Sequence, residues 1–145
     1  MKFKYGIVFL VIAAFIAIGT AFAHMSCIFI GPQCYSAQMA PVQIIESAKN
    51  GTLLAPIGTV IVSVIFIVLG LYALSGAKVI RKLPLLSFGI YTIAALCIIR
   101  GVLPLQLWFR YPDKVSDVVF YVGLVWLVTG LLYFFGFRNM QKTSV

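Results

Sequence analysis

The stretch 55-APIGTVIVSVIFIVLGLYALSGA-77 decides the fold, because residues 55–77 contain no charged side chain. A helix that crosses the apolar core of a bilayer needs about 20 predominantly apolar residues. The run is continuous rather than alternating, which argues against a strand of a membrane β-barrel. Pro56 stands near its beginning, where proline favours the first turn of a helix. The stretch therefore predicts a membrane-spanning helix.

Three further runs of the same character lie at residues 5–23, 83–105 and 116–137. Ser116 or Asp113 is suited to cap the start of the last one. The chain of 145 residues is 63% hydrophobic and 10% charged, whereas a soluble domain is about half apolar and about a quarter charged. We therefore predict an all-α integral membrane protein, a single domain of residues 1–145 with four transmembrane helices in a compact bundle.

The basic residues, which give a formal net charge of +8, predict the direction of the chain. One side of the predicted bundle would collect seven of them and no acid: Lys2, Lys4, Lys78, Arg81, Lys82, Arg138 and Lys142. The other side would collect three bases and the three acids: Lys49, Arg110, Lys114, Glu46, Asp113 and Asp117. By the positive-inside rule, both termini are expected in the cytoplasm and residues 24–54 form an external loop. Bases at the ends of apolar runs indicate topology, so we expect no nucleic-acid partner.

The first run has a second interpretation, as a secretory signal. Lys2 and Lys4 precede the apolar run, and residues 21–23 read "AFA", a small-x-small cleavage pattern. Cleavage after Ala23 would leave three spans and a mature chain that begins at His24. The length of the run favours a retained first span.

Cys27 and Cys34 stand in the expected external loop, separated by "IFIGPQ". The Gly31-Pro32 pair predicts a turn that brings the two thiols together, and an external loop faces an oxidising space. A disulfide over so short a loop stabilises by roughly 2–3 kcal/mol in the chain-entropy description. We therefore predict a structural disulfide, with two free and buried cysteines as the alternative.

Two chemical interpretations of the same loop stay open. In a thiol-redox protein the pair would react with a partner, although the chain has no Cys-x-x-Cys and no second external pair. In a metal-handling protein, His24, Cys27 and Cys34 would be the ligands, since His24 and Cys27 share one helical face. Met25 and Met39 would add soft ligands suited to copper or zinc.

Residues 41–50 predict a short amphipathic helix on the outer surface. Pro41 is suited to open it and Asn50-Gly51 to end it. Val42 and Ile45 would face the bilayer or the bundle, with the polar residues turned away.

Arg100 is the charged residue inside the third run, and such a residue is a functional hypothesis by default. It lies sixteen residues after Pro84, about 24 Å along a helix, which places it near the outer boundary. We expect it to pair with Glu46 or Asp117, or to extend into water. The alternative is a ligand site, because a guanidinium binds phosphate and carboxylate.

The chain has no phosphate-binding glycine loop, His-Glu-x-x-His motif or serine elbow, and no carboxylate in the interior of a span. Gly123 and Gly130 are seven residues apart, on one face of a helix, and permit close helix packing. We therefore expect a non-enzymatic structural or partner-binding membrane component that uses no cofactor. Its partners would be the lipid bilayer, a second copy or another membrane protein. Short loops favour the bacterial inner membrane. Alternatives are a carrier or enzyme for a small or lipid-like anion near Arg100, and the thiol or metal chemistry above.

Overall fold

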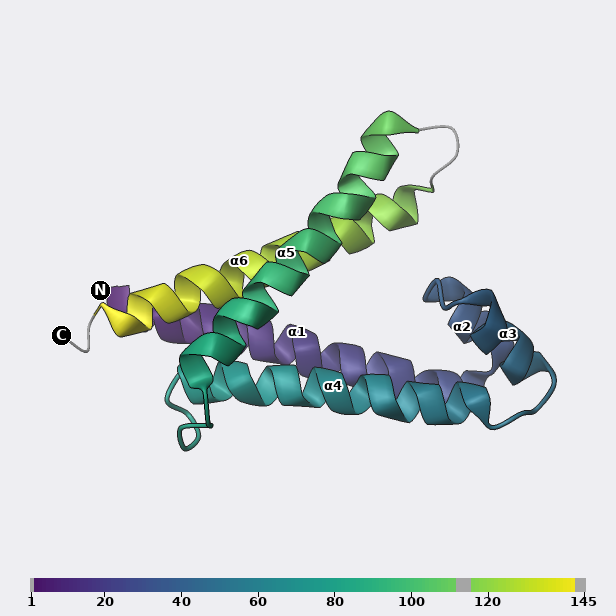
Figure 1. The fold of residues 1–145 in the computed structure, drawn as a ribbon, viewed down its shortest axis with the longest axis horizontal. Coiled ribbons are helices and arrows are strands. Elements are labelled where there is room, and N and C mark those ends of the chain that lie inside the picture. The colour runs from purple at the N-terminus through teal and green to yellow at the C-terminus, as the bar shows by residue number, and fades with distance from the viewer. Residues whose placement is uncertain (1, 112–115, 143–145) are drawn as a thin grey trace. The chain divides into compact units, whose positions relative to one another are not determined.

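The computed structural model describes residues 2–111 and 116–142, and every regular element in these ranges is an α-helix (Figure 1). The helices are α1 (Lys2–Ile30), α2 (Pro32–Ala37), α3 (Val42–Lys49), α4 (Leu54–Gly76), α5 (Leu86–Arg110) and α6 (Asp117–Gln141). The all-helical class predicted from the sequence is confirmed. Asp113 and Lys114 lie outside the described residues. Ser116 precedes α6, but its side chain makes no capping hydrogen bond.

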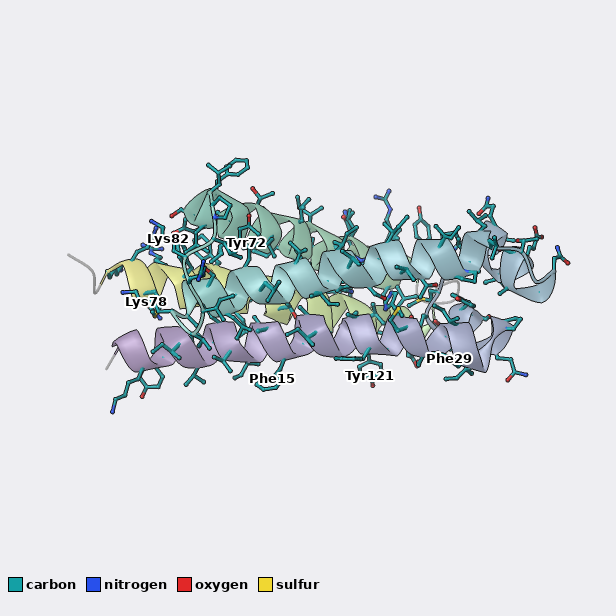
Figure 2. The ribbon with its side chains drawn as sticks, turned by 90° about the horizontal axis from the view of Figure 1, so that it is seen from below. Phe15, Phe29, Tyr72, Lys78, Lys82 and Tyr121 are labelled. Carbon is teal, nitrogen blue, oxygen red and sulfur yellow. A yellow bond between two sulfur atoms is a disulfide. The ribbon has the colours of Figure 1, made fainter. Side chains whose placement is uncertain are left out.

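Four helices, α1, α4, α5 and α6, are long and apolar enough to cross a membrane. Large apolar side chains project from these helices, among them Phe15 and Phe29 on α1 and Tyr121 on α6 (Figure 2). Exposure of so many large apolar side chains to water is unfavourable, whereas their contact with the acyl chains of a bilayer is favourable. The chain therefore has the surface of a membrane protein.

Helix α1 is longer than the sequence predicted, because it continues past Ala23 to Ile30. His24 was expected to open a loop, yet its ring nitrogen Nδ1 lies 2.9 Å from the carbonyl oxygen of Thr20. Ser26 donates a hydrogen bond to the Ala23 carbonyl at 2.8 Å. These polar side chains are satisfied by the carbonyls of their own helix, so they do not interrupt it. Residues 24–30 are therefore helical.

Helix α5 also departs from its expected limits. It begins at Leu86 rather than at residue 83, and it continues through Pro104 to Arg110. A proline inside a helix removes one backbone hydrogen bond, and α5 accommodates this loss without ending.

The helices gather into two compact units, one of residues 1–14 with 71–145 and the other of residues 15–70. In the first unit, α5 and α6 pack side by side (Figure 1). Their contacts show that they run in opposite directions. Gly123 lies against Gly101, whereas Gly130, later in α6, lies against Ala94 and Ile98, earlier in α5. Glycine lets the two backbones approach closely.

The first turns of α1 pack against the end of α6 in the same unit. A methyl group added at Gly6 would lie 2.9 Å from the Gly136 carbonyl oxygen. Leu10, Ile90 and Tyr133 are fully buried and supply large side chains to the core of this unit. The unit therefore combines close backbone contacts with an apolar core.

The second unit joins the rest of α1 to most of α4. Ser63 donates a hydrogen bond to the Ala21 carbonyl at 3.2 Å, and the ring centre of His24 lies 5.3 Å from that of Phe66. Helices α2 and α3 pack against each other in the segment that connects α1 to α4.

Gly130→Ala is expected to destabilise the α5–α6 packing. The added methyl would lie 2.8 Å from the backbone nitrogen of Ile98 and 2.9 Å from the Ala94 carbonyl oxygen, and backbone atoms cannot move aside cheaply. We expect a loss of about 1–3 kcal/mol, measured as a lower midpoint of thermal unfolding in mild detergent.

Gly19→Ala is the matched control, because nothing lies within 4 Å of an added methyl there. Alanine favours a helix over glycine by about 1 kcal/mol, so this variant should unfold at the same or a higher temperature. Equal midpoints for the two variants would contradict the close contact at Gly130.

Candidate functional site

A disulfide hairpin forms where α1 ends. Gly31 has a φ of 91°, which favours glycine, and Pro32 opens α2 in the position where proline is preferred. The Gly31 N–H donates to the Cys27 carbonyl at 2.9 Å. This turn brings the Cα atoms of Cys27 and Cys34 to 5.1 Å and places their sulfur atoms at bonding distance. The two cysteines predicted to pair are thus brought together.

The hairpin has a small core of its own in the second unit. Cys27 is 1% exposed and clusters with the buried residues Tyr35 and Ala55. The hydroxyl groups of Tyr35 and Thr59 lie 3.0 Å apart in a hydrogen bond. Reactive cysteines are partly exposed and lie in electropositive surroundings, whereas Cys27 is buried and Cys34 is partly buried against the same apolar cluster. The surroundings are those of a structural crosslink.

Ser47 fastens α3 to the beginning of α4. Its buried hydroxyl accepts the backbone N–H of Ala55 at 2.8 Å and lies 2.6 Å from the hydroxyl of Thr52. The first N–H groups of a helix have no partner within it, so Ser47 acts as a cap supplied from a neighbouring helix.

His24, proposed from the sequence as a metal ligand, contacts the Thr20 carbonyl oxygen through Nδ1, and its ring lies next to that of Phe66. Because a carbonyl oxygen only accepts, Nδ1 carries the hydrogen in its contact with Thr20. Cys27 and Cys34 are joined to each other, and sulfur in a disulfide is not a thiolate ligand. Within residues 2–111 and 116–142, no group of three His, Cys, Asp or Glu side chains is placed to hold a metal ion.

Arg100 is exposed on α5, and its guanidinium carbon lies 5.9 Å from the ring centre of Trp126 on α6. This is a cation–π contact, worth about 0.5–1 kcal/mol at an exposed site. Arg100 does not form the expected ion pair with Asp117, which instead accepts a hydrogen bond from Trp108 Nε1 at 3.3 Å. Glu46, the other expected partner, belongs to the second unit. The structure therefore pairs Arg100 with an aromatic ring.

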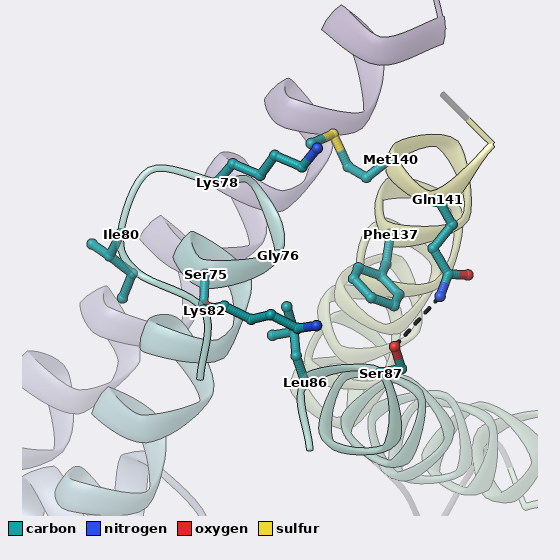
Figure 3. Close-up of a pocket in the computed structure, with 10 residues that line it drawn as sticks. All are labelled: Ser75, Gly76, Lys78, Ile80, Lys82, Leu86, Ser87, Phe137, Met140 and Gln141. Atoms are coloured by element: carbon teal, nitrogen blue, oxygen red, sulfur yellow. Dashed lines mark hydrogen bonds between the residues drawn. The ribbon is translucent and has the colours of Figure 1, made fainter. Parts of the chain in front are cut away.

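A cavity of about 570 Å³, here called the basic pocket, lies elsewhere in the first unit (Figure 3). Its walls are Ser75, Gly76, Lys78, Ile80, Lys82, Leu86, Ser87, Phe137, Met140 and Gln141. The α4–α5 connection supplies both lysines, which extend from it toward α6 and toward the start of α5 (Figure 3). Arg100 is about 20 Å farther along α5 from Leu86. A ligand site near Arg100 was the alternative prediction, and this cavity lies at the opposite end of the helix.

Two hydrogen bonds hold α5 and α6 together beside the basic pocket. Gln141 donates to the Ser87 hydroxyl at 3.5 Å (Figure 3) and accepts from the Tyr91 hydroxyl at 2.8 Å. The sequence analysis used Lys78 and Lys82 only to orient the chain. A signal in the sequence that could have indicated an anion site is the set of two lysines and two serines around the start of α5, with no acidic residue nearby.

No known protein family matches the chain, and neither a curated protein nor a solved structure shows a match to it. The interpretation of the disulfide hairpin and of the basic pocket therefore depends on their own geometry and chemistry.

Replacing both Cys27 and Cys34 by serine is expected to lower stability by roughly 2–3 kcal/mol. The wild-type pair should also resist alkylation until a reductant is added, as read by mass spectrometry of the unfolded protein. Cys97→Ser is the control, because Cys97 is buried and free. Alkylation of all three cysteines without reductant would contradict the disulfide.

Proposed function

We propose that the chain is a multi-pass membrane protein that acts as a structural or partner-binding component of a bacterial inner membrane. Both termini and the α4–α5 connection would face the cytoplasm, and the disulfide hairpin with α2 and α3 would lie outside. The observation that carries this proposal is the clustering of positive charge at one end of the first unit.

Three segments bring basic residues to that end. The α1 start carries Lys4 and packs against the end of α6 near Gly136. Arg138 lies in the last turn of α6, and Lys142 follows its last residue. The α4–α5 connection, with Lys78 and Lys82, lines a pocket with that same end of α6. Cytoplasmic segments of membrane proteins are enriched in lysine and arginine. The three segments therefore support one cytoplasmic face.

The outer face of α6 supports a role in contact with other molecules of the membrane. Glycines at 123 and 130 are used for packing on α5. Val118, Tyr121, Val125, Val128 and Phe135 are exposed at helical spacing. This face is open to lipid and to a helix of a second copy, and we assign it to self-association.

The orientation is tested with reporter fusions that distinguish cytoplasm from the outside. Fusions after Lys82 and after Lys142 should report the cytoplasm, and a fusion after Asn50 should report the outside. The physical reason is the charge bias, with seven bases and no acid on the cytoplasmic side. A cytoplasmic signal at Asn50 would overturn the proposed orientation.

Self-association is tested by a photoreactive amino acid placed at Tyr121, which is 64% exposed. Irradiation of membranes that hold two differently tagged copies should give an adduct that carries both tags. Tyr133, which is fully buried on the same helix, is the matched control and should react only within one chain. An adduct with lipid alone at position 121 would contradict self-association through this face.

A further inference from the structure

We infer that the basic pocket binds the phosphate group of an anionic phospholipid. The inference rests on the proposed membrane location and gives one end of the protein a ligand. The pocket combines the ammonium groups of Lys78 and Lys82 with buried apolar walls from Leu86, Phe137 and Met140 (Figure 3). A phospholipid offers the complementary pair, a phosphate anion joined to apolar chains.

Hydrogen bonds from side chains of α4 hold the connection that carries both lysines. The Ser75 hydroxyl accepts the Leu83 N–H at 2.9 Å and donates to the Arg81 carbonyl at 3.1 Å. The Tyr72 hydroxyl donates to the Pro84 carbonyl at 3.2 Å. A connection held at these points loses little conformational freedom when a ligand binds, which favours affinity.

Lys78 stands where α4 ends, in a backbone conformation that normally selects glycine. Its φ is 60°, its N–H donates to the Ser75 carbonyl, and the Val79 N–H donates to the Leu74 carbonyl at 3.0 Å. This is the Schellman arrangement, in which glycine is usual and asparagine is accepted. The position therefore permits removal of the lysine charge without damage to the turn.

The start of α5 adds positive potential to the pocket. Leu85 precedes the helix with an apolar side chain and gives no capping hydrogen bond. The unpaired N–H groups and the dipole at a helix start attract anions, and the Ser87 hydroxyl lines the pocket beside them. Asp117, the acid at the other end of α6, is twenty residues before Phe137, about 30 Å along the helix. A phosphate in the pocket would meet no nearby carboxylate of α6.

Exposed apolar side chains beside the lysines favour a lipid over free phosphate. Val79, Leu85 and Phe88 are 59%, 77% and 71% exposed, on the connection and on the first turn of α5. A lipid anchored by its phosphate would cover these side chains with acyl chains, whereas inorganic phosphate would leave them in water. The ligand that satisfies both features is a phospholipid of net negative charge.

The test compares retention of phosphatidylglycerol and phosphatidylcholine on the full chain in detergent, by native mass spectrometry. Wild type should prefer phosphatidylglycerol. Lys78→Asn and Lys82→Gln should each weaken its retention about fivefold, and the double variant about 25-fold, because a surface lysine contributes about that factor toward anionic lipid. Arg100→Gln removes the same charge at the other end of α5 and should change retention by less than about twofold.

Unchanged unfolding midpoints would show that the lysine variants remain folded, and each single variant gives a reading if the double variant does not fold. Equal losses for Arg100→Gln and Lys82→Gln, or full retention in both lysine variants, would overturn the site. Displacement of the lipid by millimolar inorganic phosphate would assign the pocket to free phosphate instead. The reporter fusions measure orientation independently, so a failure here is distinguishable from a failure of the proposed membrane arrangement.

Discussion

The need to satisfy every backbone and side-chain hydrogen-bonding group within an apolar medium governs this structure. An unpaired polar group in the core of a bilayer costs several kcal/mol, so the long apolar runs must be helical. The polar side chains inside these helices follow the same rule. Thr20 donates to the Ile16 carbonyl, and Thr129 donates to the Val125 carbonyl, each at 2.7 Å. Such pairs let hydroxyl groups exist within a span without an external partner.

The same requirement explains the different solutions at the two ends of α4. At its beginning, the Ser47 hydroxyl from α3 supplies the missing acceptor for the Ala55 N–H, and the neighbouring disulfide holds the hairpin together. At its end, backbone N–H groups of the following turn donate to the carbonyls of Leu74 and Ser75. The Ser75 hydroxyl makes hydrogen bonds to the α4–α5 connection. Each end of α4 is thus held by the hydroxyl group of one serine, Ser47 or Ser75, beside the two candidate sites.

The sequence predicted the features that depend on local composition. Length and apolar character identified the four long helices, and the spacing of Cys27 and Cys34 around Gly31-Pro32 predicted their pairing. It failed where a polar residue is satisfied locally, since His24 was taken as a helix end. It also failed where the partner is distant in sequence. The contact of Arg100 with Trp126 and the basic pocket each depend on α6 packing against α5, which no periodicity within one helix reveals.

Lys78 shows how one residue serves several physical requirements that conflict with one another. A left-handed backbone conformation costs a non-glycine residue about 1–2 kcal/mol, so glycine would make the turn after α4 more stable. A positive charge at a helix end instead interacts favourably with the helix dipole, by about 0.3–1 kcal/mol. That gain offsets only part of the backbone cost, and the remainder is consistent with a function for the charge. The positive-inside bias requires a base in this connection but not at this position, because Arg81 and Lys82 already supply it. What position 78 adds to Lys82 is a second ammonium group on the wall of the basic pocket, beside Met140 (Figure 3).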